Sequence, residues 1–304
     1  RGGMAQQLYR AAYAFLGNKK GGLAMSTVVA CGMFSAISGS SIATAATMSK
    51  VAMPEMRRYR YADSLATASI AAGGTLGILI PPSVILVIYG ILTEQSIGKL
   101  FMAGFLPGFL GILLYTLAVY FVVTRNPSLG PAGERTAWPQ RLLALKDVWT
   151  TLSLFVFVIG GIYIGVFSAT EAAGMGAAGA LLITFFKGNL TGGVLLEVSR
   201  EAALLTAKLF ALLFGASMFS NFLNRAGFPD ALLDIINYFE LSGLSVILLI
   251  LLIYILLGCV FESMSMILLT VPIFAPLVQT LGFDLIWFGI LVVVVTEISL
   301  ITPP

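Results

Sequence analysis

Long apolar runs, separated by short polar connections, follow one another along the whole sequence. A helix needs about 20 apolar residues to cross the hydrocarbon core of a bilayer. The runs lie near residues 22–49, 64–92, 100–124, 148–167, 171–187, 202–223, 241–280 and 285–302. With 59% hydrophobic and 10% charged residues, the chain has too few polar groups to cover a soluble domain of this size. The sequence therefore predicts an all-α polytopic membrane protein, and the alternating pattern of a membrane β-barrel is absent.

Two of these runs contain residues that usually interrupt a helix. Residues 73–83 read GGTLGILIPPS, and the sequence ends in EISLITPP, residues 297–304. Glycine permits close backbone approach, and proline supplies no N–H to the carbonyl one turn earlier. Irregular backbone is tolerated at membrane depth only within protein or beside an aqueous cavity. We therefore predict two broken transmembrane helices with carbonyl oxygens available to an ion; ordinary kinks that aid helix packing are the alternative.

The distribution of positive charge indicates that the run 22–49 does not cross the membrane. Basic residues, which favour the cytoplasmic side, flank it at both ends: Lys19, Lys20, Lys50, Arg57, Arg58 and Arg60. This predicts a re-entrant hairpin that turns near residues 35–41. No Lys or Arg follows Arg225. The run 241–280 is therefore predicted to be a second hairpin, entering from the opposite side and turning near residues 259–265.

The two halves of the chain resemble each other when their double prolines, Pro81-Pro82 and Pro303-Pro304, are superimposed. The same alignment pairs Pro54 with Pro276, Ser40-Ser41 with Glu262-Ser263, and Thr75 with Glu297. Because the predicted hairpins enter from opposite sides, we expect inverted repeats. Secondary transporters use such repeats to bring interrupted helices together near the bilayer midplane.

Composition excludes several other classes of function. The sequence contains no histidine, and its net charge is only +3. Histidine-dependent catalysis and histidine metal sites are excluded, and no Cys/His cluster or pair of intramembrane aspartates suggests an enzyme. Nothing indicates nucleic-acid binding, and no repeated filter loop suggests a channel.

Several stretches resemble the large membrane subunit of the tripartite ATP-independent periplasmic (TRAP) transporters. They are SGSSIATAATM, GGTLGILIPPSVILVIYGILTEQSIGKLFMAGFLPG, GIYIGVFSATEAAGMGA, MILLTVPIFAPLV and EISLITPP. The resemblance implies a sodium-coupled secondary active importer of an organic anion, a C4-dicarboxylate or a sialic-acid-like carboxylate, working by an elevator mechanism in the bacterial inner membrane. It also implies a small TRAP membrane subunit and a periplasmic substrate-binding protein as partners, and no organic cofactor. The alternative is a sodium/dicarboxylate symporter of a related inverted-repeat family that needs no binding protein.

The resemblance also implies a division into moving and fixed parts. An amphipathic arm helix is expected over 1–21, and a second over 226–240. The transport domain would comprise 22–95 and 241–304, each with one hairpin and one broken helix, and 96–225 would form the scaffold. Family members continue past the position of Pro304 into a Gly-x-Asn turn and a final helix.

Candidate site residues follow from the matching motif positions. A first sodium site is expected at Ser38, Gly39, Ser41, Gly74, Gly77 and Pro81. A second is expected at Glu262, Ser263, Met264, Thr296, Thr302 and Pro303. Solute contacts are expected from Ser40, Thr44, Thr75 and Glu297. Glu262 and Glu297 are costly inside a membrane segment, so each faces a cavity or is stabilised at a helix end. Glu171 begins an apolar run, where capping is the expected role.

Overall fold

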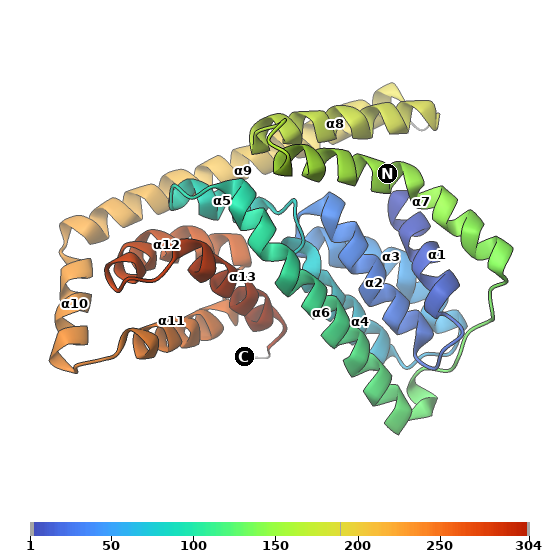
Figure 1. The fold of residues 1–304 in the computed structure, drawn as a ribbon, viewed down its shortest axis with the longest axis horizontal. Coiled ribbons are helices and arrows are strands. Elements are labelled where there is room, and N and C mark those ends of the chain that lie inside the picture. The colour runs from blue at the N-terminus through green and yellow to red at the C-terminus, as the bar shows by residue number, and fades with distance from the viewer. Residues whose placement is uncertain (1–2, 189, 303–304) are drawn as a thin grey trace. The chain divides into compact units, whose positions relative to one another are not determined.

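A computed structural model describes residues 3–188 and 190–302, and within these residues the regular structure is entirely helical (Figure 1). The prediction of an all-α chain is thus confirmed for the described part. The α-helices are α1 (Met4–Leu16), α2 (Gly22–Ser38), α3 (Ser41–Arg58), α4 (Asp63–Thr75), α5 (Val84–Leu92), α6 (Ile97–Arg125), α7 (Trp138–Tyr163), α8 (Ala169–Phe186), α9 (Gly192–Arg225), α10 (Phe228–Tyr238), α11 (Gly243–Gly258), α12 (Ser263–Thr280) and α13 (Leu285–Ile301). Two short 3-10 helices lie at Leu76–Ile78 and Pro127–Leu129.

The chain divides into two compact units. Unit 1 comprises Arg1–Val84 and Gly104–Asn189, and unit 2 comprises Ile85–Ala103 and Leu190–Pro304. The units are defined by packing. The predicted division into transport and scaffold domains concerns motion, so it stays a prediction.

Helix α2 forms the centre of unit 1, where it packs against α1, α3 and α4. Its sequence, GLAMSTVVACGMFSAIS, is rich in small residues, which let neighbouring helices approach closely. Leu23, Ala24 and Cys31 are fully buried there, against Met48 and Met56 of α3. The core of unit 1 is therefore built around a helix buried on nearly every side.

Polar side chains in this buried helix are satisfied within the helix itself. The hydroxyls of Ser26, Thr27 and Ser35 donate to the carbonyls four residues earlier, at 2.7, 2.8 and 2.7 Å. A buried hydroxyl without a partner would be costly, and this local bond removes that cost. The hydroxyls can thus be buried without partners from neighbouring helices.

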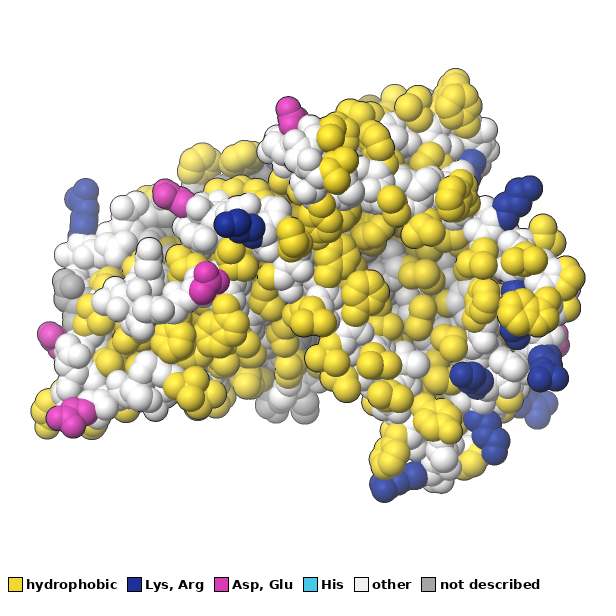
Figure 2. Space-filling view, viewed as in Figure 1, with side chains coloured by type: hydrophobic (Ala, Val, Ile, Leu, Met, Phe, Trp, Pro, Cys, Tyr) yellow, Lys and Arg dark blue, Asp and Glu magenta, His cyan; other side chains and the backbone are white. Residues whose placement is uncertain are grey.

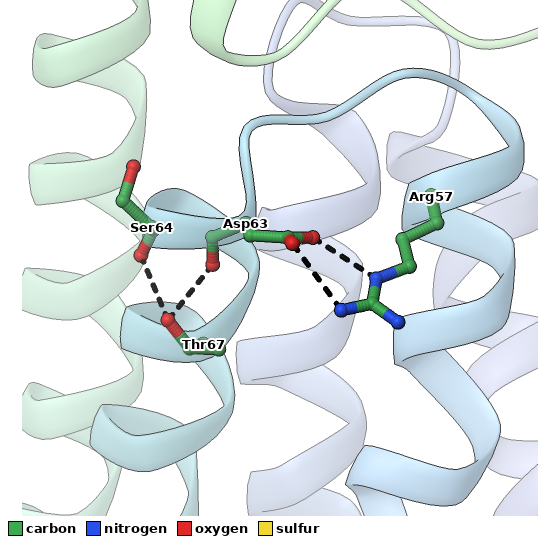
Figure 3. Close-up of polar contacts among 4 residues, drawn as sticks. All are labelled: Arg57, Asp63, Ser64 and Thr67. Atoms are coloured by element: carbon green, nitrogen blue, oxygen red, sulfur yellow. Dashed lines mark hydrogen bonds and ion pairs between the residues drawn. The ribbon is translucent and has the colours of Figure 1, made fainter.

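An ion pair joins the end of α3 to the start of α4 (Figure 3). Arg57 donates from Nε and Nη2 to the two carboxylate oxygens of Asp63, at 3.0 and 3.2 Å, and Thr67 donates to the Asp63 carbonyl. The Arg57 guanidinium lowers the pKa of Asp63. Because both side chains are exposed, the pair adds little stability, and its main effect is to fix the geometry of the turn.

Unit 2 is organised around α12 and α13. Helix α11 packs against both, and α12 also packs against α9. Tyr89 of α5 is fully buried and donates to the Leu285 carbonyl at the start of α13, at 2.6 Å. A Cβ added at Gly289 would lie 2.4 Å from the Tyr89 ring. The ring of Tyr89 thus packs where α13 has no side chain.

Among the described residues, five helices are long and apolar enough to cross a membrane by length and composition: α6, α7, α8, α9 and α12. Helices α8 and α9 are largely unburied within the structure, and Figure 2 shows hydrophobic side chains over much of the surface. Apolar surface of this extent requires lipid or protein to cover it. Shorter apolar helices are α2, α11 and α13.

The predicted turns and interruption are present as local structure. The run 22–49 turns at Gly39 and Ser40, the run 241–280 turns between Gly258 and Ser263, and the run 64–92 is interrupted between Thr75 and Val84. The predicted arm segments form α1 and α10. Whether the two helical hairpins are re-entrant and oppositely oriented in a membrane stays a prediction.

Replacing Tyr89 with Phe should destabilise unit 2 by about 1 kcal/mol, because one buried hydrogen bond is lost while the ring packing is kept. For a chain of 304 residues, we expect the melting temperature of the detergent-solubilised protein to fall by about 1–2 °C. Tyr238→Phe is the matched control, since Tyr238 is 82% exposed. Equal melting temperatures for Tyr89→Phe and the wild type would contradict this packing.

Candidate functional site

The turn between α2 and α3 concentrates small polar groups. Helix α2 ends at Ser38 and is followed by Gly39, whose φ of 59° suits glycine; Ser40 then caps α3 by accepting from the Ala43 N–H. The Ser38 hydroxyl contacts the Thr44 hydroxyl at 2.5 Å and the Ser40 carbonyl at 3.3 Å. Thr44 is fully buried. The turn thus places hydroxyl and carbonyl oxygens together.

The interruption after α4 removes hydrogen-bond donors from the backbone. The 3-10 helix Leu76–Ile78 follows α4, and residues 79–83 are not helical. Pro81 and Pro82, joined by a cis peptide bond, have no N–H to offer the carbonyls of Gly77 and Ile78 one turn earlier. Two carbonyl oxygens at this point therefore lack their usual helical donors.

The turn and the interruption are in direct backbone contact. A Cβ added at Gly77 would lie 2.6 Å from the Ser40 carbonyl oxygen, and one at Gly39 would lie 2.9 Å from the Pro82 carbonyl oxygen. A Cβ at Gly74 would lie 3.4 Å from the Ser41 carbonyl oxygen. We call this contact the first cluster; it joins Ser38, Gly39, Ser40, Ser41 and Thr44 to Gly74, Gly77 and the segment containing Pro81.

Thr75 lies at the edge of the first cluster with its hydroxyl directed elsewhere. It donates to the Ala72 carbonyl at 2.7 Å and lies 3.2 Å from the Tyr115 hydroxyl of α6. No sequence pattern pointed to Tyr115, because it lies 40 residues further along the chain and only packing brings it near. Its place beside Thr75 makes it an additional polar group at this site.

A second cluster lies in unit 2, where the turn after α11 meets α13. Glu262 caps α12, and its Oε2 accepts from the N–H groups of Met264 and Ser265 at 3.0 and 3.3 Å. The Ser263 hydroxyl donates to Glu297 Oε1 at 3.1 Å, and both side chains are buried. The second cluster therefore contains one exposed carboxylate at a helix end and one buried carboxylate.

Other predicted residues of the second cluster occupy varied surroundings. Thr296 is buried, and its hydroxyl has no hydrogen-bond partner among the described residues. The Met264 side chain packs against the apolar cluster of Ile88, Ala216 and Leu268. Thr302 donates to the Ile298 carbonyl at 2.8 Å, and Pro303 lies outside the described residues.

Ser299 is a polar residue of the second cluster that sequence reasoning did not select. It is fully buried, donates to the Thr296 carbonyl at 2.6 Å, and occupies the space that a side chain at Gly258 would need. The sequence feature that could have identified Ser299 is its position in the motif EISLITPP, between the predicted site residues Thr296 and Thr302. The first and second clusters belong to different units, so their meeting in one cavity stays a prediction.

Glu171 has the capping role expected from the sequence. Ser168 caps α8, its hydroxyl accepts from the Glu171 N–H, and the Glu171 carboxylate accepts from the Ser168 N–H at 2.8 Å. This reciprocal arrangement is a capping box. The prediction of a structural role for Glu171 is confirmed.

Comparison with known proteins gives matches over the full length of the chain. Residues 1–304 match the family described as the DctM component of the tripartite ATP-independent periplasmic transporter. The C4-dicarboxylate TRAP transporter large permease protein DctM of Pseudomonas aeruginosa is 37% identical, over 100% of this chain and 71% of the relative. The ectoine/5-hydroxyectoine large permease of Ruegeria pomeroyi is 34% identical over the same shares. The sialic acid large permease of Vibrio cholerae is 32% identical over 99% of this chain and 70% of the relative.

Replacing Gly77 with Ala should disrupt the first cluster, because the new Cβ would meet backbone atoms of Ser40 and Ser41 that cannot move independently. Overpacking of this kind costs about 1–3 kcal/mol. We expect a lower melting temperature and faster proteolysis between α2 and α3.

The control for this substitution is Gly174→Ala in α8, where an added Cβ meets no atom within 4 Å. It should leave stability unchanged or raise it by up to about 1 kcal/mol through helix propensity. If both variants behave alike, close approach at Gly77 is not required.

Proposed function

Because this chain belongs to the DctM component family of the tripartite ATP-independent periplasmic transporters, we propose that it imports an organic anion together with sodium ions across the bacterial inner membrane. The proposal includes an elevator mechanism, in which the hairpins and broken helices move against the remaining helices. The observation that carries it is the first cluster, where a hairpin turn contacts an interrupted helix.

The general class of this protein follows from the family relationship. The chain is a multi-pass membrane transport component of the TRAP family, and it is not an enzyme. The family relationship also supports import that depends on a substrate-binding protein.

Sodium coupling is supported by the donor atoms of the first cluster. The carbonyls of Gly77 and Ile78 lack proline N–H donors, Gly77 contacts the backbone of the turn at Ser40, and the hydroxyls of Ser38 and Thr44 lie together in that turn. Oxygen atoms, those of carbonyls and hydroxyls included, are the ligands that hard cations prefer. Free carbonyls at interrupted helices are how secondary transporters hold coupling ions. In unit 2, Ser263, Thr296 and Glu297 supply a second group of buried oxygens.

An anionic solute is supported by the two helix starts and by the relatives. The N-terminal end of α3 carries a neutral serine cap, whereas that of α12 is already neutralised by Glu262. The positive end of a helix dipole favours an anionic group, so α3 is the better place for a carboxylate. The relatives are named for C4-dicarboxylates, ectoine and sialic acid. We propose a small carboxylate-bearing solute of this range, with Ser40, Thr44 and Thr75 as its contacts. Glu297, which the sequence also suggested as a solute contact, is assigned to the second group of oxygens instead, because a buried carboxylate repels an anion.

The proposed partners are a periplasmic substrate-binding protein that delivers the solute and a small TRAP membrane subunit. A symporter that works without a binding protein is the alternative. The names of the relatives favour the TRAP arrangement, because each is a TRAP large permease.

Uptake into proteoliposomes that contain the chain, the small subunit and a candidate binding protein should require an inward sodium gradient. Ser41→Ala should raise the sodium concentration for half-maximal uptake by about tenfold, equivalent to ~1.4 kcal/mol, because it perturbs the start of α3 in the first cluster. Ser153→Ala, on an exposed face of α7, should leave sodium activation unchanged.

Three outcomes would overturn parts of the proposal. Equal uptake with potassium or proton gradients would show that transport is not coupled to sodium. Full uptake without the binding protein would favour the alternative symporter. Unchanged sodium activation in Ser41→Ala would show that the first cluster is not a sodium site.

The predicted inverted orientation can be tested by cysteine labelling in a Cys31→Ala, Cys259→Ala background. Gln279→Cys, exposed at the end of α12, should react with an impermeant reagent from the periplasm. Ser128→Cys, exposed in the loop after α6, should react only from the cytoplasm. Asp284 is unsuitable because its carboxylate caps α13. Labelling of both positions from one side would refute the predicted topology.

A further inference from the structure

A basic cavity of about 590 Å³ lies in unit 1, where the loop before α7 meets the end of α1. Its lining includes three cations, Lys19, Arg135 and Arg141, and neither Asp nor Glu. Glu134, beside Arg135 in the chain, is exposed and does not line the cavity. Figure 2 shows Lys and Arg side chains gathered around the region where α7 begins. A concave, positively charged site of this kind favours an anion.

Arg141 is held in this cavity by aromatic rings. Its guanidinium carbon lies 5.0 Å from the Trp138 ring centre and 5.7 Å from the Phe15 ring centre, distances typical of cation–π contacts. Its Nε is buried and has no hydrogen-bond partner in the part of the chain that the structure describes. Buried donors are normally satisfied. This donor is therefore positioned for a ligand that carries an acceptor oxygen.

An apolar trough of about 300 Å³ lies further along the same helices. Helices α1, α2, α6 and α7 line it, together with Ile80 of the interruption. Phe105 and Phe109 come from α6, and Leu145, Leu152 and Phe155 come from α7. The lining is almost wholly hydrocarbon, so the trough suits an aliphatic chain.

The basic cavity and the trough share one seam between α1 and α7. On α1, Phe15 lines the cavity, and Ala11 and Leu8 line the trough. On α7, Arg141 lines the cavity, and the trough runs from Leu145 to Phe155. Leu8 and Ala11 pack against Val148 in one buried cluster, which joins the two helices along this seam.

The length of the trough matches one leaflet of a bilayer. Leu145 and Phe155 are separated by about 15 Å along the helix axis at 1.5 Å per residue. One leaflet contributes half of a hydrocarbon core that is about 30 Å thick. The trough is thus long enough for the buried part of one acyl chain.

We propose that this seam binds an anionic phospholipid, with its phosphate beside Lys19, Arg135 and Arg141 and one acyl chain in the trough. An acyl chain gains little binding free energy by entering the trough, because the surrounding lipid is equally apolar. Selectivity therefore falls on the charged headgroup. Because Gly32 of α2 and Ile80 also line the trough, the bound chain lies against elements that form the first cluster.

The test is native mass spectrometry of the full chain in detergent, with equimolar dioleoyl phosphatidylglycerol and dioleoyl phosphatidylcholine. We expect one retained phosphatidylglycerol per chain and a preference of about tenfold over phosphatidylcholine. Arg141→Ala and the double variant Lys19→Ala, Arg135→Ala should abolish the preference. The double variant changes only exposed side chains, so it remains informative if Arg141→Ala fails to fold. Leu152→Trp should reduce retention by filling the trough.

Matched controls lie on the same helix outside both cavities. Lys146→Ala removes one positive charge, and Leu143→Trp adds the same bulk at an exposed position; both should retain the lipid. Equal retention of the two phospholipids would overturn the proposal, and so would an equal loss in Lys146→Ala and Arg141→Ala. Retention that survives Leu152→Trp would show that no acyl chain occupies the trough. Displacement by millimolar glycerol phosphate would indicate a site for a soluble phosphate in place of a lipid.

Discussion

Unit 1 depends on a close backbone contact between the α2–α3 turn and the interruption after α4. At Gly77 a single methyl group would overlap the backbone of Ser40 and Ser41. At Gly39 the left-handed φ and the nearby Pro82 carbonyl both require glycine. A helix interrupted in an apolar chain exposes polar backbone groups, which is tolerable only beside other protein or an aqueous cavity. The contact supplies such protein cover while leaving oxygens at the turn.

The local breaks in the helices could be predicted from the sequence, because glycine and proline act on their own backbone. The turn at Gly39 and the interruption before Val84 lie where the residue types place them. The pairing of the double prolines also matches observed helix starts. Ser40 and Glu262 are both N-caps, and Asp63 and Leu285 both begin helices. Such features need only short-range chemistry.

Contacts between distant segments could not be predicted in the same way. Tyr115 beside Thr75, Tyr89 on the Leu285 carbonyl, and Arg141 between Phe15 and Trp138 each depend on how helices pack. One sequence carries no signal for such pairs, since the residue types involved are common in membrane helices. For this reason the proposed lipid site could be identified only from the packing of the helices, although its cations are visible in the sequence.

Both clusters are built on a hairpin turn, but they differ in charge. This difference affects which ion or solute each cluster can bind. Ser41 and Ser263 both begin the second helix of a hairpin. Near Ser41 the helix start is capped by neutral Ser40, and the residue that pairs with Glu297 in the alignment is Thr75. Near Ser263 the cap is Glu262, and Glu297 is buried against the Ser263 hydroxyl. A buried carboxylate repels an anion and attracts a cation. The second cluster is therefore better suited to a cation alone, whereas the first can place a cation and a carboxylate close together.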